Sequence, residues 1–266
     1  MPKSLMLALC LSWTLAAACM AEEAPLGLYQ TRAVTSGTMP DRRALGFALC
    51  FRDVVVKVSG DPRLAGHPAV DALSLKAQDT IIDFSFRDRL SGKPLHDEQG
   101  SYDRPHDLTC SFDPSKIDGV LADLGRKPWP LPRPHLVLVL AIRDMNGVRS
   151  LLASDAADRR GIDMGLSARQ SAERLGLTLR LPAAQEISDA GILVGTDGPP
   201  VRLGDAIVLS GRLDWSDAAR GWVARWRIVN EGTSAEWSIS GVSFDDAFRN
   251  GLGGAAQILS RNGTPR

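Results

Sequence analysis

The chain has 266 residues, of which 44% are hydrophobic and 23% are charged. These proportions are typical of a globular protein and exclude a disordered or fibrous chain. Lysine plus arginine and aspartate plus glutamate each number 31, so the formal net charge is zero, and the sequence lacks the basic surplus of a nucleic-acid-binding protein. The length allows one large domain or two small ones.

The N-terminus predicts a secretory signal peptide over residues 1–21. An apolar stretch runs from Leu5 to Leu15 and is followed by small residues, so we expect cleavage after Ala21 and a periplasmic mature protein. The stretch is short for a membrane-spanning helix, although an uncleaved anchor is a second interpretation. A third is a membrane-tethered lipoprotein, because the residues from Ala16 to Cys19 resemble a lipobox whose cysteine carries the lipid.

Cleavage would leave two cysteines, Cys50 and Cys110, in the mature chain. Two cysteines in an oxidising compartment usually pair. We therefore predict a disulfide between Cys50 and Cys110, with two buried free thiols as the alternative. No Cys-x-x-Cys motif and no cysteine–histidine cluster occurs, so the sequence predicts neither structural zinc nor any other cofactor.

Residues 22–126 predict an α+β lobe. The expected elements are a strand over Gly27–Thr38, helices over Arg42–Ser59 and Ala69–Gln78, strands over Thr80–Phe86 and Leu108–Phe112, and a helix from Asp113 to Gly125. The helix over 42–59 is the clearest, because its apolar residues recur every three or four positions. Leu45, Leu49 and Val56 fall on its opposite face, so we expect that face to be covered as well, for example by a second lobe.

Residues 127–134, a proline-rich segment, predict a linker, and residues 135–266 predict the second lobe. Its first element, the apolar run His135–Ile142, is typical of a strand buried on both faces. The elements that follow are a helix over Leu166–Leu175, a strand over Leu177–Leu181, three strands in antiparallel hairpins over Ala206–Trp215, Gly221–Asn230 and Ala235–Gly241, and a helix over Phe244–Leu259. The fold class is therefore a two-lobed combination of α+β and α/β, with a mixed sheet, C-terminal antiparallel hairpins and a closing helix in the second lobe.

Four tryptophans on the predicted C-terminal strands form a possible binding patch. They are Trp215, Trp222, Trp226 and Trp237, and arginines accompany them. Tryptophan and arginine are enriched at binding hot spots. The alternative is a hydrophobic face covered by the last helix, which we favour for Trp222 and Trp226 because they share strand parity.

No catalytic or cofactor motif stands out. A polar loop carries histidines and carboxylates that could bind a divalent metal, although a solvated charged loop is the favoured interpretation. These residues are His96, Asp97, Glu98, Asp103, His106 and Asp107. Asp61 and Arg63 follow the first long helix and could form a surface site, with capping and loop packing as the favoured explanation.

Short motifs in a fixed order resemble the bacterial family DUF2066. They are hydrophobic residues and Ser-Gly-Asp at a helix end (Val54 to Asp61), Phe112-Asp113 before a helix, Trp129 followed by Arg133-Pro134 and an apolar strand, the segment Gly176 to Pro182, Trp222 with Trp226, and Ser243-Phe244-Asp245 before the closing helix. The resemblance covers about Leu28 to Leu259 and implies an exported protein of unknown function. The second lobe is also loosely similar to the α/β domain of TolB amino-terminal regions and several envelope assembly lipoproteins, and such domains generally bind protein partners.

These observations favour an exported, non-enzymatic protein of the periplasm or cell envelope that acts on envelope protein partners as a binding or assembly factor. The alternative is a periplasmic hydrolase or metal-dependent enzyme with a site at the lobe junction. A small-ligand or glycan sensor that uses the tryptophans is a third hypothesis. We expect no nucleic-acid partner and no membrane span in the mature chain.

Overall fold

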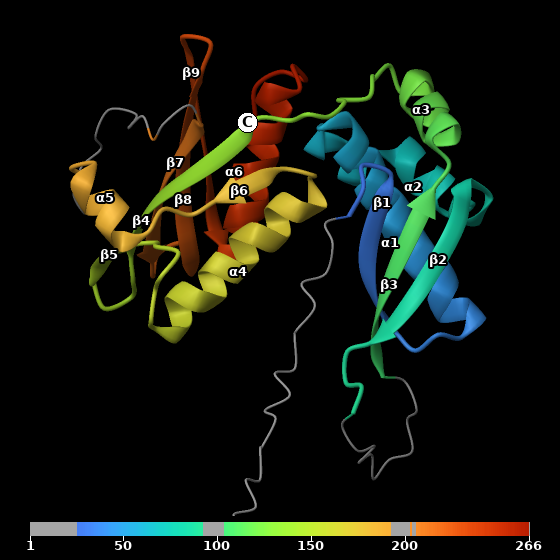
Figure 1. Ribbon diagram of the computed structural model, residues 1–266, viewed down its shortest axis with the longest axis horizontal. Coiled ribbons are helices and arrows are strands. Elements are labelled where there is room, and N and C mark those ends of the chain that lie inside the picture. Colours follow the sequence, from blue (N-terminus) through green and yellow to red (C-terminus); the bar gives the residue numbers. More distant parts are fainter. Residues whose placement is uncertain (1–25, 93–103, 193–202, 204–205, 266) are drawn as a thin grey trace, which may run out of the picture.

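The computed structural model describes residues 26–92, 104–192, 203 and 206–265. They form two lobes side by side, an N-terminal lobe within residues 26–126 and a C-terminal lobe that begins at His135 (Figure 1). The fold class predicted from the sequence, an α+β lobe followed by a lobe with a mixed sheet, is confirmed. Across these residues, no helix combines the length and the apolar character that a membrane span requires.

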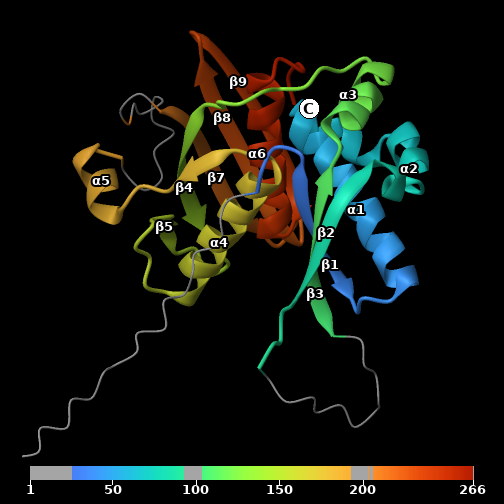
Figure 2. The ribbon, with the colours of Figure 1, turned by 45° about the vertical axis from the view of Figure 1, so that its right-hand side comes forward.

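The N-terminal lobe contains a three-stranded antiparallel sheet in the order β1-β3-β2. Its elements are β1 (Gln30–Ser36), α1 (Pro40–Ser59), the 3-10 helix η1 (Pro62–Gly66), α2 (Pro68–Ser74), the 3-10 helix η2 (Ala77–Thr80), β2 (Ile81–Asp88), β3 (Pro105–Phe112) and α3 (Pro114–Asp123). The long helix α1 lies on one side of the sheet and contacts β1 and β3 (Figure 2). The core of this lobe forms between the helix and the sheet.

Helix α1 is the central element of the N-terminal lobe, as its periodicity predicts. Proline at the first helical position and the left-handed Gly60 after the last one define its ends. Its core face is fully buried, whereas the opposite face is covered only in part. Val56 near the end of the helix is buried, but Leu45 and Leu49 remain exposed. The cover expected over this face is therefore present at Val56 and absent at Leu45 and Leu49.

The C-terminal lobe contains a six-stranded sheet in which β4 and β7 are parallel neighbours and β7, β8 and β9 form antiparallel hairpins. The elements of this lobe are β4 (His135–Arg143), β5 (Arg149–Leu151), α4 (Arg159–Arg174), β6 (Thr178–Arg180), α5 (Ala184–Asp189), β7 (Ile207–Ser216), β8 (Gly221–Asn230), β9 (Thr233–Val242) and α6 (Phe244–Leu259). Helices α4 and α6 contact each other and cover one face of the sheet (Figure 1). Leu138 and Leu140 of β4 belong to the main core, and Val137 and Val139 pack in a smaller cluster. The prediction that this strand is buried on both faces is confirmed.

Two elements of the C-terminal lobe were not predicted. β5 has three residues and α5 has six, and neither length is enough for a periodic pattern to be recognised. Helix α4 also begins at Arg159, well before the predicted start at Leu166. Asp158 caps it by accepting a hydrogen bond from the backbone N–H of Gly161, which is the usual way for an aspartate to start a helix.

Candidate functional site at the lobe junction

The four tryptophans belong to the side of the C-terminal sheet that packs on the core. Trp222, Trp226 and Trp237 are buried, and Trp215 packs edge-on against Trp222. Helix α6 approaches so closely that a Cβ atom on Gly251 would lie 2.5 Å from the Trp226 ring. The arginines of these strands occupy the alternate positions and point to the other face. The core interpretation of Trp222 and Trp226 is confirmed, and the tryptophans and arginines do not share one exposed surface.

Cys50 and Cys110 meet inside the N-terminal lobe, but the predicted disulfide is not formed, because both are free thiols. The Cys50 Sγ lies within hydrogen-bond range of the carbonyl oxygens of Thr31 and Leu108. The neighbouring Cys50 thiol, together with burial, raises the pKa of Cys110. A buried thiol with a raised pKa is not a reactive nucleophile.

The polar loop that could hold a metal lies mostly outside the described residues, which exclude His96, Asp97, Glu98 and Asp103. Of its described members, Asp107 binds Arg87 at 2.8 Å, and the Nδ1 of His106 lies 2.7 Å from a backbone carbonyl oxygen. Within the ranges that the structure covers, no group of three or more histidine, cysteine, aspartate or glutamate residues is suited to a metal ion.

Arg133 ties the two lobes together from the segment before β4. Its buried guanidinium lies 4.2 Å from the centre of the Trp129 ring. It donates hydrogen bonds to the carbonyl oxygens of Lys57 at 2.7 Å and Trp129 at 2.8 Å, and to that of Leu175. Lys57 lies in the last turn of α1 and Leu175 caps α4, so one side chain satisfies carbonyl groups at the ends of helices from both lobes. Burial lowers the pKa of Arg133 to about 10, which leaves it charged at neutral pH.

Asp61 forms a second buried anchor, directly after α1. Its carboxylate accepts hydrogen bonds from the Nε atoms of Arg63 at 2.7 Å and Arg126 at 2.8 Å, and it caps η1 through the backbone N–H of Arg63. Burial alone would raise the pKa of Asp61, but the hydrogen bonds from Arg63 and Arg126 outweigh it and hold the pKa below its ordinary value. The capping interpretation is confirmed, and Asp61 is an internal anchor, not a surface site.

The turn after α6 completes this joint. The Asn262 side chain donates to the carbonyl oxygen of Ser59 at 2.9 Å, and the Ser260 hydroxyl donates to that of Gly60 at 3.2 Å. Arg63 donates in turn to the carbonyl oxygen of Asn262 at 2.7 Å. We call the contacts around Arg133, Asp61 and Asn262 the closed end of the junction.

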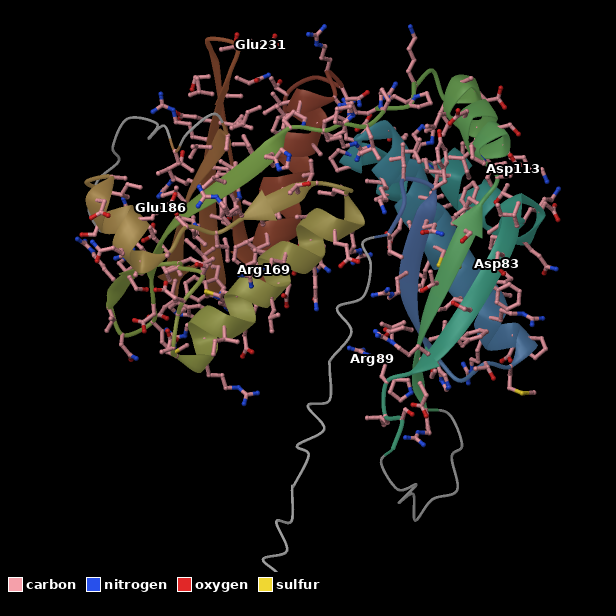
Figure 3. All side chains as sticks on the ribbon, viewed as in Figure 1. Asp83, Arg89, Asp113, Arg169, Glu186 and Glu231 are labelled. Atoms are coloured by element: carbon pink, nitrogen blue, oxygen red, sulfur yellow. The ribbon has the colours of Figure 1, made fainter. Side chains whose placement is uncertain are left out.

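A cavity of about 500 Å³ lies between the lobes beside the closed end. Its N-terminal wall comes from β1, α1 and the ends of β2 and β3, and its C-terminal wall comes from α4, which approaches β1 near the closed end and diverges from it (Figure 1). In Figure 3 the labelled lining residue Arg89 lies on the N-terminal lobe, and the labelled Arg169, which does not line the cavity, lies on α4. The lining residues are Leu26, Thr31, Arg32, Ala33, Val34, Leu49, Asp53, Lys57, Arg87, Arg89, Asp107, Gln170, Glu173 and Arg174. The volume is within the range of natural ligand sites.

Cationic side chains outnumber acidic ones in this cavity. The cations are Arg32, Lys57, Arg87, Arg89 and Arg174, and the acids are Asp53, Asp107 and Glu173. Arg87 and Arg89 both approach Asp107, at 2.8 and 3.6 Å, and two arginines therefore share one carboxylate. Such a surplus attracts anionic groups.

Lys57 lies at the inner end of the cavity and is almost completely buried. Its Nζ donates to the carbonyl oxygens of Gly27 and Gln30, both at 2.9 Å, and to that of Leu26 at 3.4 Å. Burial lowers the pKa of Lys57 to about 8, although the nearby Glu173 carboxylate opposes this shift. Because the three ammonium protons have three carbonyl acceptors, the amine fixes the chain that enters β1 and is not positioned as a nucleophile.

Apolar side chains surround the outer part of the cavity. Val34 on β1 and Leu49 on α1 line it, yet they are 52% and 46% exposed. Leu45 lies one turn before Leu49, and Leu166 lies one turn before Gln170 on α4, so these exposed leucines extend both walls. We call Val34, Leu45, Leu49 and Leu166 the open end of the junction.

The sequence analysis anticipated part of this site. It identified the second apolar face of α1, with Leu45 and Leu49, as a surface that packs against something else. It missed the contribution of α4, because Gln170, Glu173 and Arg174 look like an ordinary solvated helix face until the lobes are placed side by side. The signal that was available is the pair Ile162 and Leu166, whose apolar side chains share that polar face.

A family model described as Domain of unknown function (DUF8605) matches residues 23–130. No curated protein and no solved structure matches the chain. The family match corrects the resemblance to DUF2066, and the looser one to the TolB amino-terminal domain, which are wrong. The motifs that carried them are short and sit at helix and strand ends, where glycine, proline and aspartate recur for local reasons. The matched range contains β1 and α1 and thus the N-terminal wall of the cavity.

Proposed function

We propose that the protein is an exported, non-enzymatic binding or assembly factor of the cell envelope, and that it holds a partner protein at the lobe junction. The observation that carries this proposal is the open end, where apolar side chains from both lobes stay exposed around a cavity of about 500 Å³. Apolar groups that gather around a concave surface are typical of binding sites. The closed end supports the proposal because it holds the two walls in a fixed relation.

The side chains in the cavity favour binding over catalysis. Its described lining contains no histidine, cysteine or serine. The Asp53 carboxylate is engaged by Arg174 at 2.8 Å, and Asp107 is engaged by Arg87 at the same distance. A hydrolase or a metal-dependent enzyme at this junction would need an available base, nucleophile or ligand set. Glu173 is the remaining carboxylate of the described lining, and one carboxylate is not such a set, so this lining gives the enzymatic hypothesis no specific support.

Export and oxidation belong to the proposal. Cleavage after Ala21 would release the mature chain into an oxidising compartment, where disulfides persist. The thiols of Cys50 and Cys110 would then form a disulfide during folding, before they are buried, by exchange with an oxidised thiol–disulfide oxidoreductase, which takes up two electrons and two protons. Intact mass of the exported protein tests both steps. We expect a chain that starts at Glu22 and gains about 2 Da on reduction. A chain that retains residues 1–21, or no gain on reduction, contradicts the corresponding step.

Photo-crosslinking in intact cell envelopes tests the binding role. A photoreactive amino acid replaces Leu49 on one wall, Leu166 on the other, or Leu75, which is 84% exposed and does not line the cavity. We expect one envelope protein to be crosslinked from both walls and not from Leu75. The adduct at Leu49 should be lost when Leu166→Asp is added on the opposite wall. No adduct beyond those formed at Leu75 would contradict the proposed function.

A further inference from the structure

We infer that the occupant of the junction is an extended segment of a partner protein, in which acidic residues alternate with apolar ones, added to the N-terminal sheet as a strand beside β1. This inference rests on the proposed function and specifies its ligand class. Three features carry it: the outer edge of β1, the apolar wall formed by α1, and the cationic surplus of the sheet.

The outer edge of β1 faces the cavity. Among the described residues β1 pairs with β3 alone, and it is the strand of its sheet nearest to α4 (Figure 1). Just after β1, the Gly37 N–H donates to the carbonyl oxygen of Arg104, the residue opposite it on the chain that enters β3. Because hydrogen-bonded positions alternate along an antiparallel strand, the odd-numbered residues of β1 are the ones that bond to β3. The peptide groups of Val34 and Ser36 consequently point away from β3. An edge of this kind is a template for strand addition.

The same parity is visible at the inner end of the strand. The carbonyl oxygen of Gln30, another even-numbered residue, points away from β3 and accepts its hydrogen bond from Lys57. Lys57 thereby occupies the edge where β1 begins. An added strand would lie farther along β1, toward Val34 and the open end.

An apolar wall lies on one side of this edge. Side chains of an added strand would point alternately to the two faces of the sheet. On the face that α1 covers, they would meet the exposed side chains of Leu45 and Leu49, with Leu166 on the far wall. Burying these leucines removes apolar surface from water on both partners, so this face selects apolar side chains.

Positive charge lies on the other side of the edge. Arg32 on β1 lines the cavity on this face, with Arg87 and Arg89 farther across the sheet. Cationic side chains outnumber carboxylates in the described lining, so acidic side chains of an added strand would meet a net positive surface. An alternating acidic and apolar segment therefore matches both faces at once. A fatty acid would match the charge and the apolar wall but not the backbone edge of β1, and for this reason we favour a peptide.

Direct binding of a labelled octapeptide of alternating glutamate and valine to the full mature protein tests the inference. We expect saturable binding, weakened at least about tenfold when lysine replaces glutamate in the peptide. Val34→Pro removes an amide donor from the strand edge and should weaken binding by a similar factor, whereas Val34→Ala keeps the donor and should change it less than about threefold. Leu49→Asp should also weaken binding, with Leu75→Asp as the matched control.

Two further readouts separate folding from binding. Thermal unfolding identifies any variant that has lost its structure, and hydrogen exchange at the Val34 amide of the unaltered protein should slow when the peptide binds. No slowing there, equal affinity for the acidic and the basic peptide, or tighter binding of dodecanoate than of the acidic peptide would each overturn the inference. If Leu49 and Leu166 still crosslink one partner while the peptide fails, the strand inference is wrong and the proposed function stands. If the crosslinks also fail, both are wrong.

Discussion

The two ends of the lobe junction differ in their side chains: buried charged groups hold the closed end together, and exposed apolar groups line the open end. At the closed end the charges of Arg133 and Asp61 are buried among partners, Arg133 between two helix ends and Asp61 between two arginines. At the open end Leu49 and Leu166 stay in water although a second wall stands opposite. Closing the junction fully would bury these leucines, so the polar anchors hold the lobes in an arrangement that the hydrophobic effect alone would not select. The rigid polar anchors of the closed end thus preserve an apolar surface at the open end.

Removing the Arg133 side chain should destabilise the closed end more than any other single change proposed here. Arg133→Met leaves three carbonyl groups without their donor in a buried place, and we expect a loss of about 4 kcal/mol in the free energy of unfolding. Urea denaturation measures this loss. Arg169→Met on the exposed face of α4 is the matched control and should change stability by less than about 0.5 kcal/mol. Equal effects of the two variants would show that Arg133 does not anchor the lobes.

The Asp61→Asn variant tests the second anchor and its pH dependence. An amide offers one acceptor oxygen where two arginines need two, so we expect a loss of about 3 kcal/mol at pH 7. Because the folded pKa of Asp61 lies below its unfolded value, its contribution is present above the unfolded pKa of about 4 and is lost as the pH falls through the folded pKa. Denaturation at several pH values should show the gap between the two proteins narrowing below about pH 4. A gap independent of pH contradicts this account.

Lys57→Met tests the pH dependence of stability at the point where the closed end meets the cavity. Burial lowers the pKa of Lys57 to about 8, whereas an unfolded lysine titrates near 10.4. Between these values the unfolded chain binds more protons, so the unaltered protein should gain stability with rising pH, by on the order of 1 kcal/mol relative to the variant. Denaturation at pH 7.5 and pH 10 measures the change. A difference that does not grow would mean that the three carbonyl acceptors keep the amine protonated.

The smallest effect on stability is expected at the open end. Leu49→Asp and Leu166→Asp replace side chains that are already about half exposed, so each should change the free energy of unfolding by less than about 1 kcal/mol. The buried Leu138→Asp is the contrasting variant and should prevent folding or lower stability severely. If the two exposed leucines prove as costly to replace as Leu138, the open end is part of the core and not a binding surface.

Much of the fold could be predicted from local patterns. The stripe of α1, the apolar run of β4 and the three C-terminal strands follow from periodicity. The predicted start of α6 at Phe244 is confirmed, and there the Asp246 backbone N–H donates to the Ser243 hydroxyl. The bonding state of Cys50 and Cys110 could not be predicted, because compartment and spacing indicate an opportunity to pair and not whether two buried thiols are oxidised. The resemblance to DUF2066 was wrong for a related reason. Its short motifs mark the ends of helices and strands, which unrelated proteins share, and do not establish a family relationship.

The site could be predicted only in part, because it depends on long-range placement. Leu45 and Leu49 indicated a second apolar face of α1 because both lie within one stretch of sequence. Arg133, in contrast, looks like one more linker residue until the ends of α1 and α4 are brought to it from 76 and 42 positions away. Such groups become recognisable when the backbone carbonyls that they serve are known.

The last turn of the chain has a consequence for how the protein is made. Ser260 and Asn262 satisfy the carbonyl oxygens of Gly60 and Ser59, 200 and 203 positions earlier. A chain that is synthesised from its N-terminus therefore carries the end of α1 uncapped by these groups until all of α6 and the turn after it have been made. The N-terminal lobe can collapse early, but its joint to the second lobe is a late event, and until then the leucines and the helix end are exposed together. We therefore expect the nascent chain to need protection from aggregation until Asn262 has been made.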